Sequence, residues 1–209
     1  LASMLVGALD EAALLIASTV LTGVVVGGTV GWLAQRLRHA ALRDPMTGVG
    51  NATAWSSVLS EEIHESDRSG APLSVAFIDI DGLKSLNDGH GHAAGDTAIC
   101  EVAASLQRGL RRSDFVARLG GDEFAVLLPD TDIATAQDVL GRIRTACVTS
   151  FSVGAAQRHQ GESAGPVTER ADAVMYEMKR RTRQATAVVD DLIARSGDGP
   201  AGSIAAAGE

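Results

Sequence analysis

The sequence has few aromatic residues, few cysteines and no excess of positive charge. Aromatic side chains make up 3% of the 209 residues, which argues against a platform that stacks the bases of single-stranded nucleic acid. The formal net charge is −8, so the attraction that drives general nucleic-acid binding is missing. Cys100 and Cys147 are isolated, and we predict buried free thiols in a reducing compartment. We therefore expect no nucleic-acid partner.

A long apolar run near the N-terminus predicts a membrane helix. Residues 12–34 contain no charged residue, and their length suffices to cross a bilayer. Two acidic residues precede the run and three arginines follow it, which places the C-terminal side in the cytoplasm. The run lacks the basic leader of a signal peptide and the polar face of a soluble helix, which are the two alternatives. We expect a single-pass protein of the cell inner (cytoplasmic) membrane.

The remainder of the chain predicts one domain of the α+β class. Helices are expected at 51–66, 83–88, 95–110, 133–147 and 168–183, strands at 73–80 and 148–156, and a hairpin at 114–128. The expected organisation is a short extracytoplasmic N-terminus at 1–11, the transmembrane helix at 12–34, a juxtamembrane linker at 35–43, the folded domain at 44–190 and a disordered tail of small residues at 191–209.

Two β-prone segments lead into pairs of acidic residues. F-I-D-I-D at 77–81 ends one strand, and R-L-G-G-D-E-F at 118–124 predicts the tip of a hairpin. Gly120 and Gly121 have no Cβ and let a ligand approach the backbone. Mg²⁺ is usually held by one or two carboxylates together with substrate phosphates. Acids at the ends of neighbouring strands therefore favour a site for metal-dependent phosphoryl transfer.

Five motifs extend this pattern: D-P-M-T-G-V-G-N at 44–51, D-I-D-G-L-K-S-L-N-D-G-H-G-H-A-A-G-D at 79–96, R-L-G-G-D-E-F at 118–124, V-T-S-F-S-V-G at 148–154 and A-D-A-V-M-Y-E-M-K at 171–179. In this order they resemble the GGDEF-domain diguanylate cyclases, which join two GTP molecules into cyclic di-GMP. The resemblance implies a ferredoxin-like, palm-type domain with a mostly antiparallel central sheet and surrounding helices, preceded here by one transmembrane helix. A hairpin that family members usually carry before the last strand is missing.

The resemblance assigns the acids to metal binding and catalysis. Asp79, the backbone carbonyl of Ile80 and Asp122 match metal ligands, for Mg²⁺ or Mn²⁺ with two ions per active site. Asp122 and Glu123 match the catalytic pair, in which Glu123 helps to deprotonate the attacking 3′-hydroxyl. We interpret Asp81 as a helix N-cap rather than as a ligand.

Other positions match residues that bind GTP. Asn87 and Asp96 match the guanine readers, since an amide and a carboxylate suit the edge of that base. Lys179 and Arg183 share a helix face and match phosphate-binding residues, although a solvated basic helix end is the alternative. Backbone groups that match the phosphate cradle belong to Gly82, Leu83, Lys84, Gly120 and Gly121.

Arg111 and Asp114 form an R-x-x-D pattern upstream of the hairpin. The resemblance implies a product-binding inhibitory site, for which a guanidinium and a carboxylate suit the phosphate and guanine edges. A surface charge pair is the alternative interpretation. Cyclic di-GMP is thus an expected allosteric inhibitor as well as the product.

We expect an enzyme that condenses two GTP into cyclic di-GMP and two pyrophosphates. Each domain holds one GTP, so the resemblance implies a homodimer. Gly23, Gly27 and Gly31 lie on one face of the predicted membrane helix, where a partner helix could approach. The alternative is a catalytically silent receptor for cyclic di-GMP or GTP at the membrane, against which the intact acids of the GGDEF turn argue.

Overall fold

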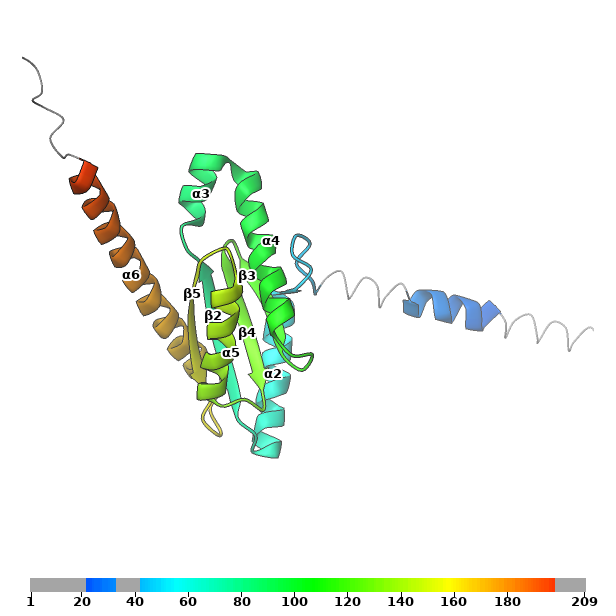
Figure 1. Ribbon diagram of the computed structural model, residues 1–209. Coiled ribbons are helices and arrows are strands. Elements are labelled where there is room, and N and C mark those ends of the chain that lie inside the picture. The colour runs from blue at the N-terminus through cyan, green and yellow to red at the C-terminus, as the bar shows by residue number, and fades with distance from the viewer. Residues whose placement is uncertain (1–21, 33–41, 198–209) are drawn as a thin grey trace, which may run out of the picture. The chain divides into compact units, whose positions relative to one another are not determined.

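The computed structural model describes residues 22–32 and 42–197. The chain divides into two units, Leu1–Arg43 and Asp44–Glu209. In the first unit, the described residues 22–32 form a helix. The second unit contains the sheet and the helices that position the candidate site (Figure 1).

The predicted transmembrane helix at 12–34 is corrected by the structure. No helix among the described residues is both long and apolar enough to cross a membrane. The expected inner-membrane location rested on the predicted helix and is corrected with it. Residues 12–21 and 33–34 of the predicted span lie outside the described residues.

A five-stranded sheet forms the centre of the second unit, in the order β1-β3-β4-β2-β5. Every strand pair is antiparallel except β1 with β3, so the predicted mostly antiparallel sheet is confirmed. The two strands that carry acidic motif residues, β2 and β4, are direct neighbours in the sheet. The strands are β1 (Gly50–Asn51), β2 (Leu73–Ile80), β3 (Phe115–Gly120), β4 (Glu123–Pro129) and β5 (Phe151–Gln157).

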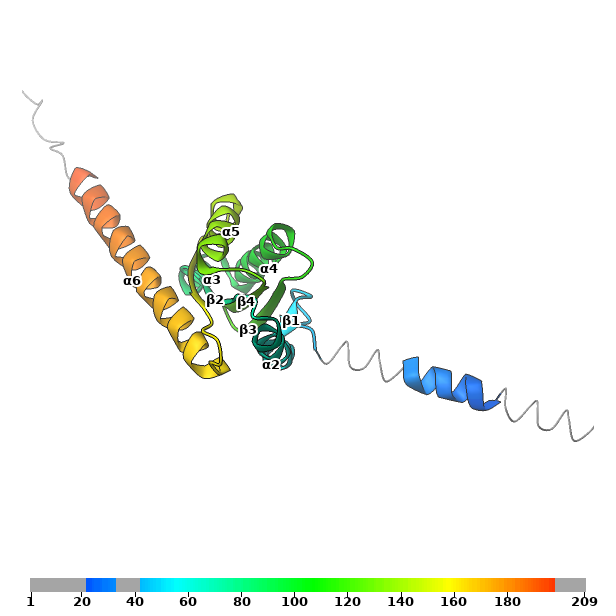
Figure 2. The ribbon, with the colours of Figure 1, turned by 90° about the horizontal axis from the view of Figure 1, so that it is seen from below.

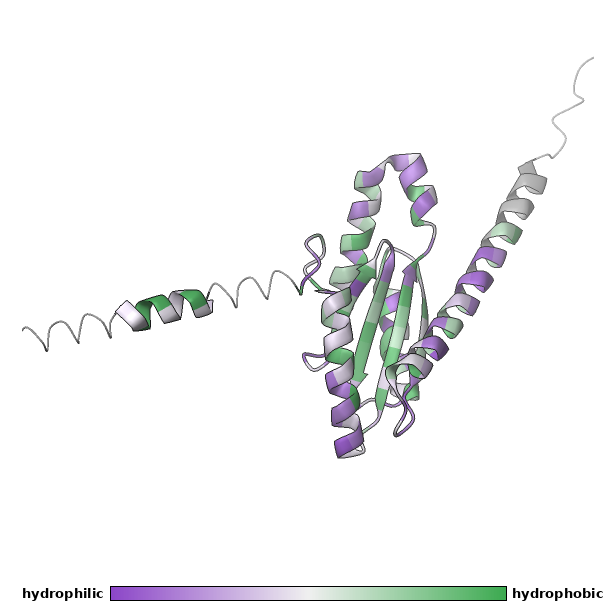
Figure 3. Ribbon diagram, turned by 180° about the vertical axis from the view of Figure 1, so that it is seen from behind, coloured by the Kyte–Doolittle hydropathy of each residue, from purple (hydrophilic) through white to green (hydrophobic). Residues whose placement is uncertain are grey.

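Helices cover both faces of the sheet, because side chains on each strand alternate between two apolar clusters. On β2, Ile78 and Ile80 pack in the cluster formed with α4 and α5, whereas Leu73 and Val75 pack in the cluster formed with α2 and α6. Figures 2 and 3 show this layering, with apolar strands between helices that carry polar residues. The helices are α2 (Ala52–Ser69), α3 (Leu83–His90), α4 (His92–Gly109), α5 (Ile133–Ala146) and α6 (Ala164–Gly197).

Several element boundaries differ from the predictions, among them the start of β5 and the end of α6. β5 begins at Phe151 rather than at residue 148, because Glu101 holds the preceding segment by accepting hydrogen bonds from the Val148 N–H and the Thr149 hydroxyl. α5 connects directly to β5 through this segment. No hairpin lies between them, as the sequence predicted. α6 continues to Gly197, since no glycine or proline interrupts residues 180–196. Residues 198–209 of the predicted tail lie outside the described residues.

Candidate active site

The predicted acids meet at one end of the two central strands. Asp79 on β2 is paired with Glu123 on β4, and the Ile80 N–H donates a hydrogen bond to the Asp122 carbonyl at 3.2 Å. Asp122 lies in the tight turn between β3 and β4, where Gly121 has a φ of 51°. A left-handed conformation of this kind strongly favours glycine. The sheet therefore brings together the metal-ligand candidates Asp79, Ile80 and Asp122.

Arg118 holds the shape of this turn. Its Nε and Nη2 donate hydrogen bonds to the Gly121 carbonyl at 3.0 and 2.7 Å. Its Nη1 lies 3.4 Å from both carboxylate oxygens of Asp44, which begins the first motif of the domain. Asp44 is itself fixed by the N–H and hydroxyl of Thr47, at 2.9 and 2.6 Å. The first and third motifs are thus physically joined at the glycine turn.

Asp79 is the most deeply buried of the candidate acids, at 4% exposure. Its Oδ2 accepts from the Lys179 ammonium, which comes from α6. Its Oδ1 is buried and has no hydrogen-bond partner. Burial raises the pKa of Asp79, the Lys179 ammonium opposes this shift, and the Asp122 carboxylate adds to it. A buried carboxylate oxygen that has no hydrogen-bond partner in the protein is well suited to coordinate a cation.

Glu123 stands beside Asp79 at the sheet end and is exposed. Loss of hydration raises the pKa of Glu123, and the neighbouring carboxylates of Asp122 and Asp79 raise it further. A carboxyl group with a raised pKa is a better proton acceptor near neutral pH than an ordinary one. The surroundings of Glu123 are therefore compatible with the predicted base.

Gly154 on β5 determines where α6 lies. A Cβ at this position would be 2.0 Å from the Met175 N atom and 2.4 Å from the Ala171 carbonyl oxygen. Only a residue without a side chain permits this approach of strand and helix. Lys179 follows Met175 by one helical turn, so the close packing at Gly154 sets the position from which Lys179 reaches Asp79.

A surface cavity of about 670 Å³ opens beside the acids. Its walls are the end of β2, the start of α3, the turn after β3 and one face of α6. Backbone N–H groups at the start of α3 suit an anion, because the first N–H groups of a helix have no helical partner. The predicted site residues that line it are Ile80, Gly82, Leu83, Lys84, Asp122, Lys179 and Arg183, joined by Asp81, Ser85, Ser150, Thr182 and Ala187.

Asp81 does not cap α3, so the interpretation as an N-cap is wrong. The N-cap residue is Gly82, which makes no side-chain capping bond. The carboxylate of Asp81 instead accepts from the hydroxyls of Ser150 and Ser152, at 2.9 and 2.7 Å. These bonds tie the end of β2 to β5. The alternation of Ser150 and Ser152 at the start of β5 was the sequence signal for this contact.

Asn87 and Asp96 lie on neighbouring helices, α3 and α4. Asn87 packs against Gly95, where an added Cβ would be 2.0 Å from the Asn87 Oδ1. That oxygen is buried and has no hydrogen-bond partner, whereas Asp96, the next residue after Gly95, is exposed. The structure therefore places the two predicted guanine readers together. Neither is among the residues that line the cavity.

Arg111 and Asp114 lie away from the acids, before β3 begins. Gly120 follows Asp114 by six positions, which is about 20 Å along an extended strand. The Asp114 Oδ2 accepts a hydrogen bond from the Arg111 N–H at 2.7 Å, and the Arg111 side chain is exposed. The R-x-x-D pattern is thus a pre-formed turn that presents a guanidinium to solvent.

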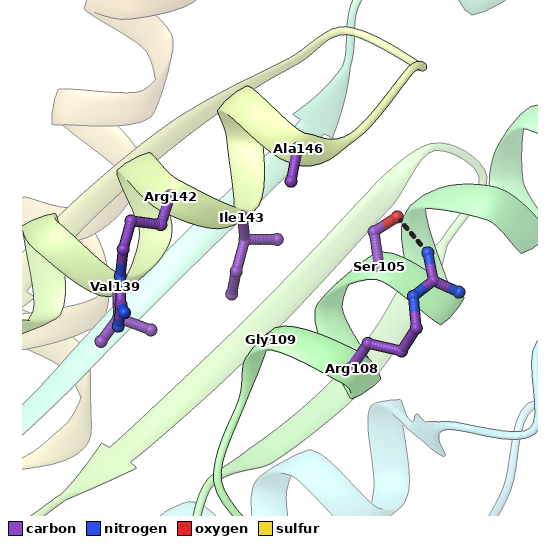
Figure 4. A pocket seen from close by; sticks show the side chains of 7 residues that line it. All are labelled: Ser105, Arg108, Gly109, Val139, Arg142, Ile143 and Ala146. Atoms are coloured by element: carbon purple, nitrogen blue, oxygen red, sulfur yellow. Dashed lines mark hydrogen bonds between the residues drawn. The ribbon is translucent and has the colours of Figure 1, made fainter.

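A second cavity, of about 330 Å³, lies between α4 and α5 (Figure 4). Arg108 and Arg142 contribute to its walls, and the Arg108 Nη2 donates to the Ser105 hydroxyl at 3.0 Å. It contains none of the predicted site residues. The larger cavity beside Asp122 is therefore the candidate active site.

The number of side-chain ligands at the candidate site limits how a metal ion could be bound there. Within residues 22–32 and 42–197, no three His, Cys, Asp or Glu side chains gather so that they could hold a metal ion by themselves. Asp79 and Asp122 provide two carboxylates and Ile80 provides a carbonyl. This set fits a Mg²⁺ or Mn²⁺ ion that takes its other ligands from substrate phosphates and water.

The fold and the acids at the end of its central strands define a class of protein. A family profile described as "Diguanylate cyclase, GGDEF domain" matches residues 41–185. The chain belongs to this family, which confirms the resemblance drawn from the five motifs.

The relatives include diguanylate cyclases of Pseudomonas aeruginosa. DgcP is 39% identical over 158 residues, which cover 70% of this chain and 24% of DgcP. TpbB is 36% identical over 161 residues, which cover 70% of this chain and 37% of TpbB. The chain thus spans a quarter to somewhat over a third of the length of these relatives.

A solved structure supports the ferredoxin-like α+β fold. The GGDEF domain of DgcB from Caulobacter crescentus, determined in complex with c-di-GMP, aligns with a TM-score of 0.66 at 32% identity. The match covers 68% of this chain and 89% of the DgcB domain. The predicted fold of the second unit is therefore confirmed, whereas the membrane helix predicted before this unit is corrected above.

Proposed function

We propose that this chain carries the catalytic domain of a diguanylate cyclase, which condenses two GTP into cyclic di-GMP and two pyrophosphates. One observation carries the proposal. In the described part of the chain, two buried side-chain polar atoms lack a partner, and they are the Oδ1 atoms of Asp79 and Asn87. They stand at the positions assigned to the metal ion and to guanine. An unpaired buried acceptor is unfavourable unless a ligand satisfies it.

The residues at the strand ends would hold the metal. Asp79, the Ile80 carbonyl and Asp122 would bind Mg²⁺ or Mn²⁺, two ions in each active site. When bound, such ions neutralise the negative charge of the phosphates and stabilise the attacking and leaving oxygens. Glu123, whose pKa is raised by its surroundings, would accept the proton of the 3′-hydroxyl.

The cavity walls would bind the triphosphate of GTP. Lys179 and Arg183 supply positive charge from α6, and the start of α3 supplies backbone N–H groups from Gly82 to Lys84. Gly120 and Gly121 keep the turn beside Asp122 free of side chains, and a Cβ at either position would have no atom within 4 Å. Asn87 and Asp96 would bind the guanine edge. Each domain would hold one GTP, so two chains must meet as a homodimer before the two nucleotides can react.

The first experiment incubates the purified protein with Mg²⁺ and either GTP or ATP. We expect cyclic di-GMP from GTP, detected by liquid chromatography and mass spectrometry, and no corresponding product from ATP. Asn87→Ala should reduce kcat/KM for GTP, because a lost buried partner costs about 1–3 kcal/mol. Asp88→Ala, an exposed neighbour on α3, is the control. Binding of GTP without turnover by the parent protein would instead indicate a silent receptor.

Arg111 and Asp114 would form an inhibitory site for the product. A guanidinium and a carboxylate on a pre-formed turn suit phosphate and guanine, and DgcB was solved with c-di-GMP. Arg111→Ala should keep the initial rate and lose inhibition by added cyclic di-GMP. Arg112→Ala, the exposed neighbour, should retain inhibition. Absence of product binding to the parent protein by calorimetry would reduce the pair to a surface feature.

A further inference from the structure

The lysines of this chain are unusually placed. Arginine and lysine together number 18, yet only Lys84 and Lys179 are lysines. Both line the candidate active-site cavity. Lys84 is exposed, whereas the Lys179 side chain is 19% exposed and contacts the Asp79 carboxylate, whose side chain is 6% exposed. The two lysines therefore occupy the same cavity in different electrostatic settings.

Asp79 requires a counter-charge. A buried carboxylate without a nearby cation is strongly unfavourable, and Asp79 also experiences repulsion from Asp122 and Asp81. Lys179 is the cation that contacts it in the structure. Lys179 thus neutralises the most deeply buried acid of the site.

The same contact conflicts with the proposed metal ligand role of Asp79. Lys179 takes Oδ2, and only Oδ1 is left without a partner. A divalent ion at Oδ1 would lie within a few ångströms of the ammonium on the same carboxylate, and two cations at such a distance repel each other strongly. A lysine side chain is a compact charge on a flexible stem, so it can move while the helix stays in place.

We propose, building on the function proposed above, that Lys179 is a built-in counter-cation that competes with the metal ion for Asp79 and transfers to the substrate phosphates. The destination lies on the same helix face. Arg183 is one turn further along α6 and lines the same cavity, so the two side chains converge on the space assigned to the triphosphate. Lys179 would thereby couple metal entry to nucleotide binding.

The test measures metal binding without nucleotide. The full chain is titrated with Mn²⁺ and free Mn²⁺ is followed by electron paramagnetic resonance. Lys179→Met removes the competing charge and should tighten Mn²⁺ binding by about tenfold or more. Arg183→Met removes a charge of the same sign that does not contact Asp79 and should change the Mn²⁺ affinity by less than about twofold.

Other outcomes contradict the proposal. Unchanged or weaker Mn²⁺ binding by Lys179→Met would mean that Lys179 supports Asp79 as a metal ligand instead of competing for it. Failure of the parent and both variants to bind Mn²⁺ would also overturn it, since removing a competitor should reveal the site. The Mn²⁺ titration does not depend on turnover. An inactive parent protein would therefore contradict the proposed function, while the competition between Lys179 and Mn²⁺ would still be measurable.

A second measurement on the parent chain covers the case in which Lys179→Met does not fold. Amines are acetylated briefly with an N-hydroxysuccinimide ester, with and without Mn²⁺, and both lysines are quantified by peptide mass spectrometry. Mn²⁺ should increase acetylation of Lys179 severalfold, because it releases the ammonium from Asp79. Acetylation of Lys84 should stay constant as the internal control. Equal acetylation of Lys179 under both conditions would refute the exchange.

Discussion

Asp122→Ala is expected to lower cyclic di-GMP synthesis by at least about a hundredfold, since loss of even an indirect support of a metal ligand commonly costs 10- to 100-fold. The fold should survive the substitution. Asp122 is half-buried in a turn, and its structural bond is made by the backbone carbonyl that accepts from Ile80, which alanine retains. Product formed per minute at saturating GTP and Mg²⁺ measures the effect.

The control for this substitution is Asp138→Ala, which removes an exposed acid on α5. Its activity should match that of the parent protein. Circular dichroism and thermal unfolding establish that both variants are folded. Near-parental synthesis by a folded Asp122→Ala protein would remove Asp122 from the metal site and leave Asp79 without its proposed partner.

Gly154→Ala should destabilise the domain by about 2–3 kcal/mol, at the upper end of ordinary overpacking. The added Cβ meets the Met175 N atom and the Ala171 carbonyl oxygen, and backbone atoms cannot rotate away as a flexible side chain can. α6 must therefore shift, which displaces Lys179 and Arg183. Urea unfolding of the parent and the variant gives the change in the free energy of unfolding.

Gly141→Ala is the matched control for this prediction. Gly141 lies within α5, and a Cβ there has nothing within 4 Å. Replacing a helical glycine by alanine should stabilise the domain by about 0.5–1 kcal/mol. If Gly154→Ala instead behaves like Gly141→Ala, the packing of α6 on β5 is looser than the structure describes.

The strand β2 and the turn between β3 and β4 could be predicted because the residues that determine them are close together in the sequence. The apolar run of β2, its terminal acids and the glycine turn between β3 and β4 each lie within a few residues. The position of Asp79 next to the GGDEF turn followed once the two strands were placed together. The end of α6 was set too early, because the last matching motif residue was taken as the end although no helix stop signal lies there.

The contacts that were not predicted join residues far apart in the chain. Lys179 reaches Asp79 across 100 residues, and Asp81 meets Ser150 across 69. Gly154 has no side chain, so its contact with Met175 could not be predicted from a hydropathy pattern. The membrane helix was predicted from the apolar run at 12–34, and among the described residues no helix is both long and apolar enough to cross a membrane.

The candidate site has two halves that differ in how readily they open locally: acids on central strands of the sheet, and side chains on helices. Asp79 and Glu123 stand on β2 and β4, each of which has a hydrogen-bonded neighbour on both sides. Asn87 stands on α3, which contacts α4, and Lys179 stands on α6, which packs on β5 and β2. Amide hydrogens of central strands generally exchange only on global unfolding, while peripheral helices open more readily. The acids therefore form the rigid half of the candidate site, and the side chains proposed to bind the nucleotide lie on helices that can open locally without unfolding of the domain.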